Sequence, residues 1–590
     1  MAAPLLALSN LVIETAGPHP TRLVDGLSFN LERGKTLCIA GESGSGKSLT
    51  ALSLMRLLGS GLRVSRGTAL LDGQDLLKLT PEQIRQVRGR RLGMIFQEPM
   101  TSLNPIQTVG QQLGEAINAH QRLSAADTAR RARELLDQVQ IPEPARRLKQ
   151  HPFELSGGMR QRVMIAMALA QSPDLIIADE PTTALDVTVQ AQILALLRKL
   201  QADTGTAIIL ITHDMGVVAE MADDVLVMRK GVMVESGPVR QMFSTPQADY
   251  TRALLAAVPR LGEMIGTTAP KRASAPAPAE KMIQPARRVV EVKDLTVRFD
   301  IRSGLFGRAG QRVHAVEGIS FGLDAGETLS LVGESGCGKS TTGKALANLV
   351  PFRGDVVVNG SNLKGLSARA MKPVRRDIQM IFQDPYASLD PRMRVGDLVI
   401  EPLHIHGLAQ GSELQDRAAE LFDQVGLPRD ALRRYPHEFS GGQRQRICIA
   451  RALSLQPKVI IADESVSALD VSVQAQVLDL LQDLQSRFGI AYLFISHDMA
   501  VVEQISHRVA VMYLGRFVEI GTRAQIFENP QHAYTRRLLS AVPIPDPARE
   551  RRLYLPFGDL PSPVRPLGYE PPPVNWRDVG HGHLVAEEAA

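Results

Sequence analysis

The strongest constraint on the fold of this 590-residue chain is that most of its sequence occurs twice. The stretch LIIADEPTTALDVTVQAQ at 175–192 returns as VIIADESVSALDVSVQAQ at 459–476. Four residues recur 284 positions later: Ser156, Glu180, His213 and Tyr250 return as Ser440, Glu464, His497 and Tyr534. A constant spacing leaves no net insertion or deletion between these markers, so we expect two domains of one fold, produced by duplication and fusion.

Segments rich in Ala and Pro separate and follow the two copies. TTAPKRASAPAPAEKMIQPARR at 267–288 lacks apolar periodicity and predicts a semi-extended linker. The sequence after about residue 545 is again rich in Pro and predicts irregular structure, so we interpret His581 and His583 as part of a frayed end rather than as metal ligands. We therefore predict a first domain over 1–259, a linker over 260–289, a second domain over 290–545 and a tail over 546–590.

Short apolar runs alternate with helical patterns within each copy. TLCIA (36–40), LIIAD (175–179) and AIILIT (207–212) have counterparts TLSLV, VIIAD and AYLFIS in the second copy. Such continuous apolar runs are typical of parallel strands buried on both faces. The fold class is therefore predicted as α/β, with a mixed or mainly parallel sheet covered by helices in each domain.

Composition excludes several classes of protein. The net charge of +5 is spread along the chain without a block of Lys and Arg, which disfavours a nucleic-acid-binding arm. The start has no basic region ahead of its apolar residues, and no run is long enough to span a membrane, so we expect a cytoplasmic protein. Cys38, Cys337 and Cys448 fit neither a disulfide framework nor a metal pair and are interpreted as reduced core thiols.

Two segments match the phosphate-binding pattern GxxxxGK[ST], each after an apolar strand and before a helical run. Glycines let successive backbone N–H groups turn toward phosphate oxygens, the Lys neutralises phosphate charge, and the final Ser is placed to bind Mg²⁺. The predicted nucleotide-binding residues are Gly41, Glu42, Ser43, Gly44, Ser45, Gly46, Lys47 and Ser48, and in the second copy Gly333, Glu334, Ser335, Gly336, Cys337, Gly338, Lys339 and Ser340.

Other polar residues complete each predicted site. Asp179 and Asp463 end buried strands and are predicted to hold Mg²⁺ together with Ser48, Ser340 and the side chains of Gln97 and Gln383. The adjacent Glu180 and Glu464 are predicted to polarise the attacking water. His213 and His497 each follow their Glu by 33 residues and are expected either to contact the γ-phosphate or to orient the water and the Glu.

The segments LSGGM (155–159) and FSGGQ (439–443) carry a resemblance to the ATP-binding cassette (ABC) ATPases, covering residues 5–259 and 290–543. The resemblance implies two cassettes, each with a helical signature subdomain, that pair within one chain and bind ATP and Mg²⁺. It implies that Ser156, Gly157 and Gly158 complete the Lys339 site, and that Ser440, Gly441 and Gly442 complete the Lys47 site, each at a helix N-terminus. ALD at 184–186 and at 468–470 resembles the loop that couples the two sites.

Both copies keep the full set of site residues, so we expect both to hydrolyse ATP. Met159 replaces the Gln of the other signature loop, beyond the phosphate-facing residues. The adenine-stacking aromatic of the family corresponds to Phe299 in the second copy and to Thr15 in the first. We expect adenine to be held less well at the first site, since stacking is worth roughly 1–3 kcal/mol per base.

QEPMTSLNP, QDPYASLDP and YTRALLAAVP resemble the ATPases of peptide, opine and nickel importers, and the fused cassettes, residues 303–321 and the ending VGHGHLVA resemble those of glutathione importers. The resemblance implies import of glutathione or small peptides through two separate transmembrane permease subunits fed by a periplasmic solute-binding protein. The chain would lie peripherally on the cytoplasmic face of the bacterial inner membrane. Many relatives carry a C-terminal cysteine cluster, but this tail has no cysteine, so we predict no iron–sulfur cluster.

Three alternatives remain at this point. The solute could be a di- or oligopeptide, an opine or a related compound, because this subunit does not read it. A tandem cassette acting on nucleic acid or the ribosome is disfavoured by the Ala/Pro linker and the scattered cysteines. An exporter ATPase is disfavoured by the importer-like segments.

Overall fold

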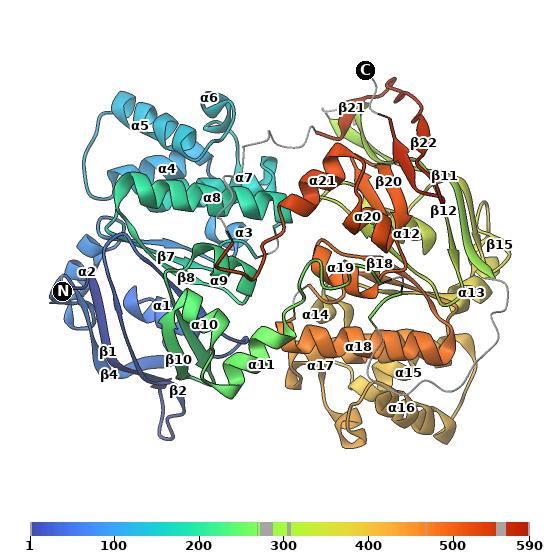
Figure 1. Ribbon diagram of the computed structural model, residues 1–590, viewed down its shortest axis with the longest axis horizontal. Helices are drawn as coiled ribbons and strands as arrows, with labels where there is room; N and C mark the ends of the chain where they lie inside the picture. Colours follow the sequence, from blue (N-terminus) through green and yellow to red (C-terminus); the bar gives the residue numbers. More distant parts are fainter. Residues whose placement is uncertain are drawn as a thin grey trace. The chain divides into compact units, whose positions relative to one another are not determined.

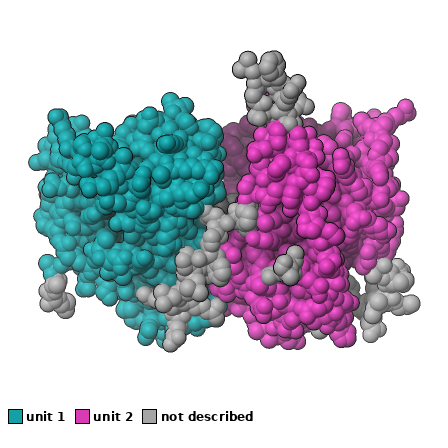
Figure 2. All heavy atoms as spheres, turned by 90° about the horizontal axis from the view of Figure 1, so that it is seen from above, with its two compact units in different colours: residues 1–185, 189–258, 543–556 teal, residues 186–188, 259–542, 557–590 magenta. Residues whose placement is uncertain are grey.

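The computed structural model describes residues 3–183, 185–267, 269–271, 287–303, 308–467, 469–549 and 562–587. The chain divides into two compact units (Figure 2). Unit 1 comprises residues 1–185, 189–258 and 543–556, and unit 2 comprises residues 186–188, 259–542 and 557–590. Residues 272–286, half of the predicted linker, lie outside the described residues.

The elements of unit 1 follow the alternation that the sequence predicts. Its strands are β1 (Leu6–Thr15), β2 (Arg22–Leu31), β3 (Thr36–Ala40), β4 (Leu62–Leu71), β5 (Gln74–Asp75), β6 (Leu92–Ile95), β7 (Leu175–Asp179), β8 (Ala207–Ile211), β9 (Asp224–Arg229) and β10 (Val232–Pro238). Its helices are α1 (Lys47–Leu54), α2 (Pro81–Val87), α3 (Pro99–Ser102), α4 (Val109–Asn118), α5 (Ala125–Gln138), α6 (Pro144–Arg147), α7 (Gly157–Leu169), α8 (Val187–Thr204), α9 (Met215–Met221), α10 (Val239–Ser244) and α11 (Asp249–Ala257).

Two sheets form the framework of unit 1. The larger has the order β10-β9-β3-β8-β7-β6 and is parallel except for β10, which confirms the predicted mainly parallel sheet. The smaller, with the order β2-β1-β4-β5, is antiparallel and was not predicted. Its strands run along alternating apolar and polar residues, a pattern that by itself does not indicate which sheet a strand joins.

Alternate residues of the buried strands face two different cores. Cys38 and Ala40 of β3 join the core that includes helices α4, α5 and α7, whereas Leu37 and Ile39 join the core beneath the antiparallel sheet and α1. This double burial explains why β3 is continuously apolar. Helices α4, α5 and α7 contact one another and form the helical subdomain (Figure 1).

Unit 2 repeats this arrangement. Its strands are β11 (Arg288–Ser303), β12 (Arg308–Asp324), β13 (Thr328–Val332), β14 (Arg353–Val358), β15 (Ser361–Asn362), β16 (Ile378–Ile381), β17 (Val459–Asp463), β18 (Ala491–Ile495), β19 (Arg508–Tyr513), β20 (Arg516–Thr522), β21 (Val564–Pro566), β22 (Trp576–Asp578) and β23 (Leu584–Ala586). Its helices are α12 (Lys339–Leu346), α13 (Ala368–Asp377), α14 (Pro385–Ser388), α15 (Val395–His406), α16 (Ser412–Gln424), α17 (Gly441–Leu453), α18 (Val471–Phe488), α19 (Met499–Ile505), α20 (Arg523–Glu528) and α21 (Ala533–Ser540).

The tail of the chain differs from its prediction. Residues 562–587 contain three short strands, and these extend both sheets of unit 2 to the orders β15-β14-β11-β12-β21 and β16-β17-β18-β13-β19-β20-β23-β22 (Figure 1). His583, interpreted from sequence as part of a frayed end, is 2% exposed and its Nε2 lies 2.8 Å from Oε1 of Glu519. The expectation of an irregular tail is therefore wrong for this segment, because edge strands distant in sequence supply its backbone partners.

Within the part of the chain that the structure describes, no helix combines the length and the apolar composition that crossing a bilayer requires.

Candidate functional site

Each phosphate-binding loop wraps around its own lysine. Nζ of Lys47 donates to the carbonyl oxygens of Gly41 (2.7 Å) and Glu42 (2.9 Å). Lys339 repeats both bonds with Gly333 (2.7 Å) and Glu334 (2.9 Å). Helices α1 and α12 begin at these lysines, so each loop leads directly into a helix N-terminus, where phosphate is favoured.

The first glycine of each loop is required by the close approach of a neighbouring strand. Gly41 has φ of 145° and Gly333 has φ of 147°, a conformation that residues with a Cβ rarely adopt. A Cβ on Gly41 would collide with the carbonyl oxygen of Met228, and one on Gly333 with that of Met512. The loop conformation is thus fixed by packing.

A serine and an aspartate meet beside each loop. Oγ of Ser48 donates to Oδ1 of Asp179 over 2.9 Å, and Oγ of Ser340 donates to Oδ1 of Asp463 over 2.7 Å. Burial raises the pKa of both aspartates, an effect that the serine hydrogen bonds oppose. Hydroxyl and carboxylate oxygens are ligands that Mg²⁺ prefers, and a site with one carboxylate suits an ion that is completed by phosphates and water.

These pairs are consistent with a metal that the protein holds only in part. Among the described residues, there is no group of three or more His, Cys, Asp or Glu side chains able to hold a metal ion alone.

Glu180 stands at the centre of the first site. It follows β7 with φ of 46°, a left-handed conformation that is costly for a residue with a side chain and is concentrated at functional sites. Its Oε2 accepts hydrogen bonds from Nε2 of Gln97 (3.1 Å) and Oγ1 of Thr183 (2.8 Å), and its Oε1 lies 3.3 Å from Nδ1 of His213. The structure thus brings together Gln97, Glu180 and His213, which are distant in sequence.

Glu464 has a corresponding glutamine and histidine beside it in unit 2. Its φ is 47°, its Oε2 accepts a bond of 2.6 Å from Gln383, and its Oε1 lies 3.4 Å from Nδ1 of His497. Burial alone would raise the pKa of Glu180 and of Glu464, but the facing histidines hold both below the usual range. The hydrogen bond to Glu180 raises the pKa of His213. Burial would lower the pKa of His497, but the hydrogen bond to Glu464 outweighs burial, so the pKa of His497 is raised as well.

The SGG segments begin helices α7 and α17. The side chains of Ser156 and Ser440 cap these helices by accepting the N–H groups of Met159 (3.3 Å) and Gln443 (3.4 Å). Gln443 also accepts the N–H of Ser440 over 3.0 Å and so completes a capping box. Met159 cannot return this bond and is instead buried in the core of unit 1, so the substitution leaves the serine cap in place.

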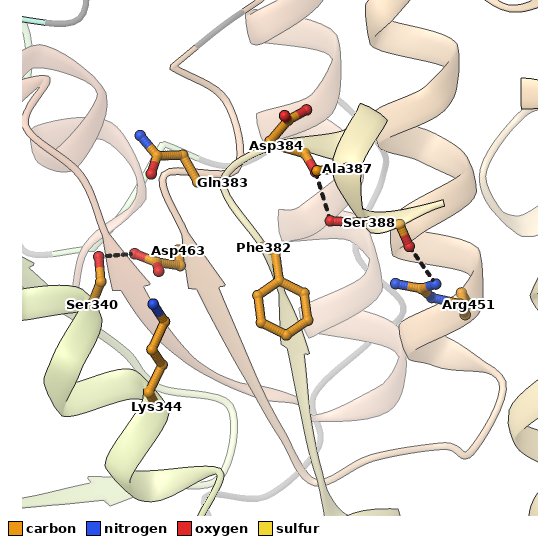
Figure 3. A pocket seen from close by; sticks show the side chains of 9 residues that line it. All are labelled: Ser340, Lys344, Phe382, Gln383, Asp384, Ala387, Ser388, Arg451 and Asp463. Atoms are coloured by element: carbon orange, nitrogen blue, oxygen red, sulfur yellow. Dashed lines mark hydrogen bonds between the residues drawn. The ribbon is translucent and has the colours of Figure 1, made fainter. Parts of the chain in front are cut away.

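A cavity of about 490 Å³ opens beside the Ser340–Asp463 pair in unit 2 (Figure 3). Its other lining residues belong to α12, α14, α17 and the loop between β16 and α14: Lys344, Phe382, Gln383, Asp384, Ala387, Ser388 and Arg451. Arg451 donates to the carbonyl oxygen of Ser388 over 2.7 Å, which ties the helical subdomain to this loop. The cavity therefore joins the predicted metal-binding residues to the loop that follows Gln383.

The structure also adds a residue whose role sequence reasoning missed. The backbone N–H of Glu334 donates to the hydroxyl oxygen of Tyr534 over 3.0 Å, so α21 supports the second phosphate-binding loop. Tyr534 lies in the repeated YTR motif, which the sequence analysis used only as a sign of common ancestry. The presence of Tyr250 at the corresponding position of the first copy was the signal that could have pointed to a role. Ala184 and Ala468 of the ALD segments lie outside the described residues.

Comparisons with known proteins identify the class to which these two sites belong. Residues 24–183 and 316–467 match the family described as ABC transporter, and residues 234–284 and 518–568 match the oligopeptide/dipeptide transporter C-terminal region. The chain therefore belongs to the ABC transporter family, as a tandem ATP-binding protein whose activity is ATP hydrolysis coupled to transport.

The relatives share almost the whole chain. The glutathione import ATP-binding protein GsiA of Salmonella choleraesuis is 56% identical over 99% of this chain and 96% of its own length. The protein of the same name from Escherichia coli K12 is 56% identical over 99% of this chain and 97% of its own. Among solved structures, the ATP-binding cassette MJ0796 bound to ADP and Pi is 28% identical, with a TM-score of 0.37, over 40% of this chain and 99% of that one.

Proposed function

We propose that this protein is the ATP-hydrolysing subunit of a glutathione importer. The observation that supports the ATPase activity most directly is the geometry around Glu180 and Glu464, each held by a glutamine and facing a histidine. The proposed solute derives from relatives named for glutathione import that align over nearly their full length. The same likeness disfavours the exporter and nucleic-acid alternatives.

Each proposed site divides the chemistry among its residues. Lys47 and Lys339 exchange their bonds to loop carbonyls for bonds to the β- and γ-phosphates, and the loop N–H groups cradle the same oxygens. Ser48, Asp179 and Gln97, with Ser340, Asp463 and Gln383 in unit 2, would hold Mg²⁺. When bound, that ion would neutralise phosphate charge.

Glu180 and Glu464 act on the attacking water. A carboxylate whose pKa is held below its usual range is ionised at neutral pH and accepts a hydrogen bond from water. His213 and His497 position these carboxylates and are placed to respond to the γ-phosphate. Phe299, 39% exposed on β11, is proposed to stack on adenine at the second site.

The signature segments are proposed, on family resemblance, to serve the opposite site. Ser156, Gly157 and Gly158 would bind the γ-phosphate held by the Lys339 loop. Ser440, Gly441 and Gly442 would bind the phosphate held by the Lys47 loop. Closure driven by ATP would then be a ligand-dependent shift between two states, with its extent set by the difference in their ATP affinity.

The loops after Gln97 and Gln383 are proposed to contact two transmembrane permease subunits. A periplasmic solute-binding protein would deliver the solute to these subunits. These loops expose apolar side chains, with Ile106 at 82% and Tyr386 at 57%. Exposed apolar residues beside a nucleotide site suit a partner helix that responds to hydrolysis. The protein would then lie at the cytoplasmic face of the inner membrane.

Uptake by cells tests this proposal. A strain that lacks the gene is given labelled glutathione, dipeptides or tripeptides, with complementation by wild type or by Lys47→Ala/Lys339→Ala. We expect loss of glutathione uptake that only wild type restores. Loss of peptide uptake alone would keep the importer and replace the solute, as the oligopeptide/dipeptide match allows. Normal uptake of all three would contradict the proposal.

A further inference from the structure

The hairpin that carries Phe299 is longer in the second copy than its counterpart in the first. Strands β11 and β12 contain 16 and 17 residues, whereas β1 and β2 contain 10 each. The pairing of β11 with β14 ends at Thr296, so Phe299 lies in a part of the hairpin beyond that strand. Phe299 pairs directly with Val313 of β12.

The C-terminal tail supplies the third strand of this extension. β21 pairs with β12 through Val564 opposite Val313, so Phe299, Val313 and Val564 occupy one line across three strands. Directly opposed residues of antiparallel strands place their side chains on the same face. A two-stranded ribbon is at best marginally stable in water, and a third strand gives it the pairing that it needs.

The residues after β21 fix the opposite face of the hairpin. Arg298, the residue before Phe299, has a side chain that is 12% exposed and shared by two carboxylates. It donates to both oxygens of Glu317 (2.7 and 2.8 Å) and to both oxygens of Glu570 in the tail (2.8 and 2.7 Å). Such bidentate, charge-assisted pairs set geometry as well as energy.

Two further contacts join the tail to the same hairpin. The ring of Tyr569 packs edge-on against that of His314, with centroids 5.6 Å apart. The backbone N–H of His314 donates to the carbonyl oxygen of Pro563 over 3.0 Å. The hydrogen bonds from Arg298 lower the pKa of Glu570, which keeps this carboxylate ionised at neutral pH. The tail is therefore attached by backbone pairing, an ion pair and an aromatic contact.

We infer that residues 562–570 form a positioning clamp that holds Phe299 for adenine and so sets the ATP affinity of the Lys339 site. This inference rests on the proposed function, in which Phe299 stacks on the base. The first copy has Thr15 in place of Phe299, and in its described residues β2 remains the edge of the sheet. The aromatic, the longer hairpin and the third strand thus occur together in the second copy.

Equilibrium binding to the full chain tests the clamp. The first site is silenced with Lys47→Ala, and the probes are ATP and inorganic tripolyphosphate, which lacks the base. The variants are Glu570→Ala and Tyr569→Ala, with Phe299→Ala as reference. Glu587→Ala serves as the control. Glu587 is an exposed tail residue that follows β23, and β23 belongs to the other sheet of unit 2 and not to the sheet of the hairpin.

We expect the tail variants to weaken ATP binding by about fivefold or more. The loss should not exceed the roughly 150-fold that a lost base stack can cost. Tripolyphosphate binding is expected to stay unchanged, and no tail variant is expected to weaken ATP binding further in the Phe299→Ala background. Unchanged ATP affinity, equal loss for both probes, or full additivity with Phe299→Ala would overturn the clamp. Absence of ATP binding by Lys47→Ala alone would instead contradict the proposed function of the second site.

Discussion

In unit 2, the backbone N–H of Thr328 donates to Nδ1 of His507 over 3.0 Å. In unit 1, the corresponding N–H of Thr36 donates to a carboxylate oxygen of Asp223 over 2.9 Å. The two copies thus hold the start of the same central strand with different chemistry. An imidazole nitrogen accepts this bond only while it is unprotonated, whereas a carboxylate accepts it as an anion.

This difference predicts that acidification removes the hydrogen-bond acceptor at this strand start in unit 2 and not in unit 1. Burial lowers the pKa of His507 in the folded state below its ordinary value of about 6.5. The unfolded chain therefore binds the proton more readily, and stability is lost as the pH falls below about 6.5. Thermal unfolding between pH 5 and pH 8 is expected to show this loss as a lower unfolding temperature at the acidic end.

The variant His507→Asp is the matched test, since it copies the arrangement of unit 1. We expect it to reduce the loss of unfolding temperature on acidification. Equal acid sensitivity in wild type and variant would show that His507 does not carry the effect.

The buried side chain of Arg523 marks a position where a single substitution is expected to destabilise unit 2. Its side chain is 2% exposed and donates to the carbonyl oxygens of Met264 (2.9 Å) and Thr267. Val239 occupies the corresponding position in the first copy. Arg523→Val is expected to destabilise unit 2 by about 3 kcal/mol, because the charged hydrogen bonds to residues 264–267 are lost.

Chemical unfolding and limited proteolysis measure this effect. Faster cleavage near residues 259–271 should accompany the lower stability. The stability of Arg523→Lys should lie between those of Arg523→Val and wild type, because lysine keeps the charge but lacks the planar guanidinium with its several donors. Wild-type stability and cleavage in Arg523→Val would refute the assignment.

Neighbouring glycines of the first signature segment are predicted to tolerate alanine differently. A Cβ on Gly158 would lie 2.6 Å from Cγ1 of Val189, whereas a Cβ on Gly157 would meet its nearest neighbour, Leu185, only at 3.9 Å. Gly158→Ala is expected to cost about 1–3 kcal/mol through overpacking. Gly157→Ala is expected to leave stability unchanged or slightly higher, since alanine favours helix.

Thermal unfolding of the two variants decides this point, and Gly158→Ala/Val189→Ala should recover stability. Lower ATP hydrolysis in Gly157→Ala at full stability would assign a functional reason to that glycine. Equal unfolding temperatures for the two single variants would contradict the packing argument.

The sequence predicts those features whose signals are local. Strands such as β3 and β7 are continuously apolar because both of their faces are buried, and the runs at 36–40 and 175–179 indicate them directly. The repeat places Gln97, Glu180 and His213 in corresponding positions of both copies. Their meeting in space follows because strand ends of a parallel sheet lie at one edge.

Features that depend on distant partners were not predictable in this way. Glu570 meets Arg298 across 272 positions, and Tyr534 meets Glu334 across 200. The Pro-rich composition of the tail indicates irregular structure, yet residues 562–587 pair with exposed strand edges that the sequence does not identify. Edge pairing is a property of the assembled sheet, so a local pattern does not contain it.

Glu180 and Glu464 test the central claim that this chain contains two complete ATPase sites. The double variant Glu180→Gln/Glu464→Gln keeps the shape of both side chains and removes the carboxylates that face water. Purified protein is incubated with ATP labelled on the α- or the γ-phosphate, and retained nucleotide and released phosphate are counted. Glu82→Gln, at an exposed carboxylate on α2, is the control.

We expect hydrolysis to fall by about 100- to 10,000-fold, the usual contribution of a positioned general base, while ATP stays bound with its γ-phosphate. Each single variant should lose hydrolysis at its own site. Turnover by the double variant at the wild-type rate would contradict the assignment of Glu180 and Glu464, and with it the account of both sites.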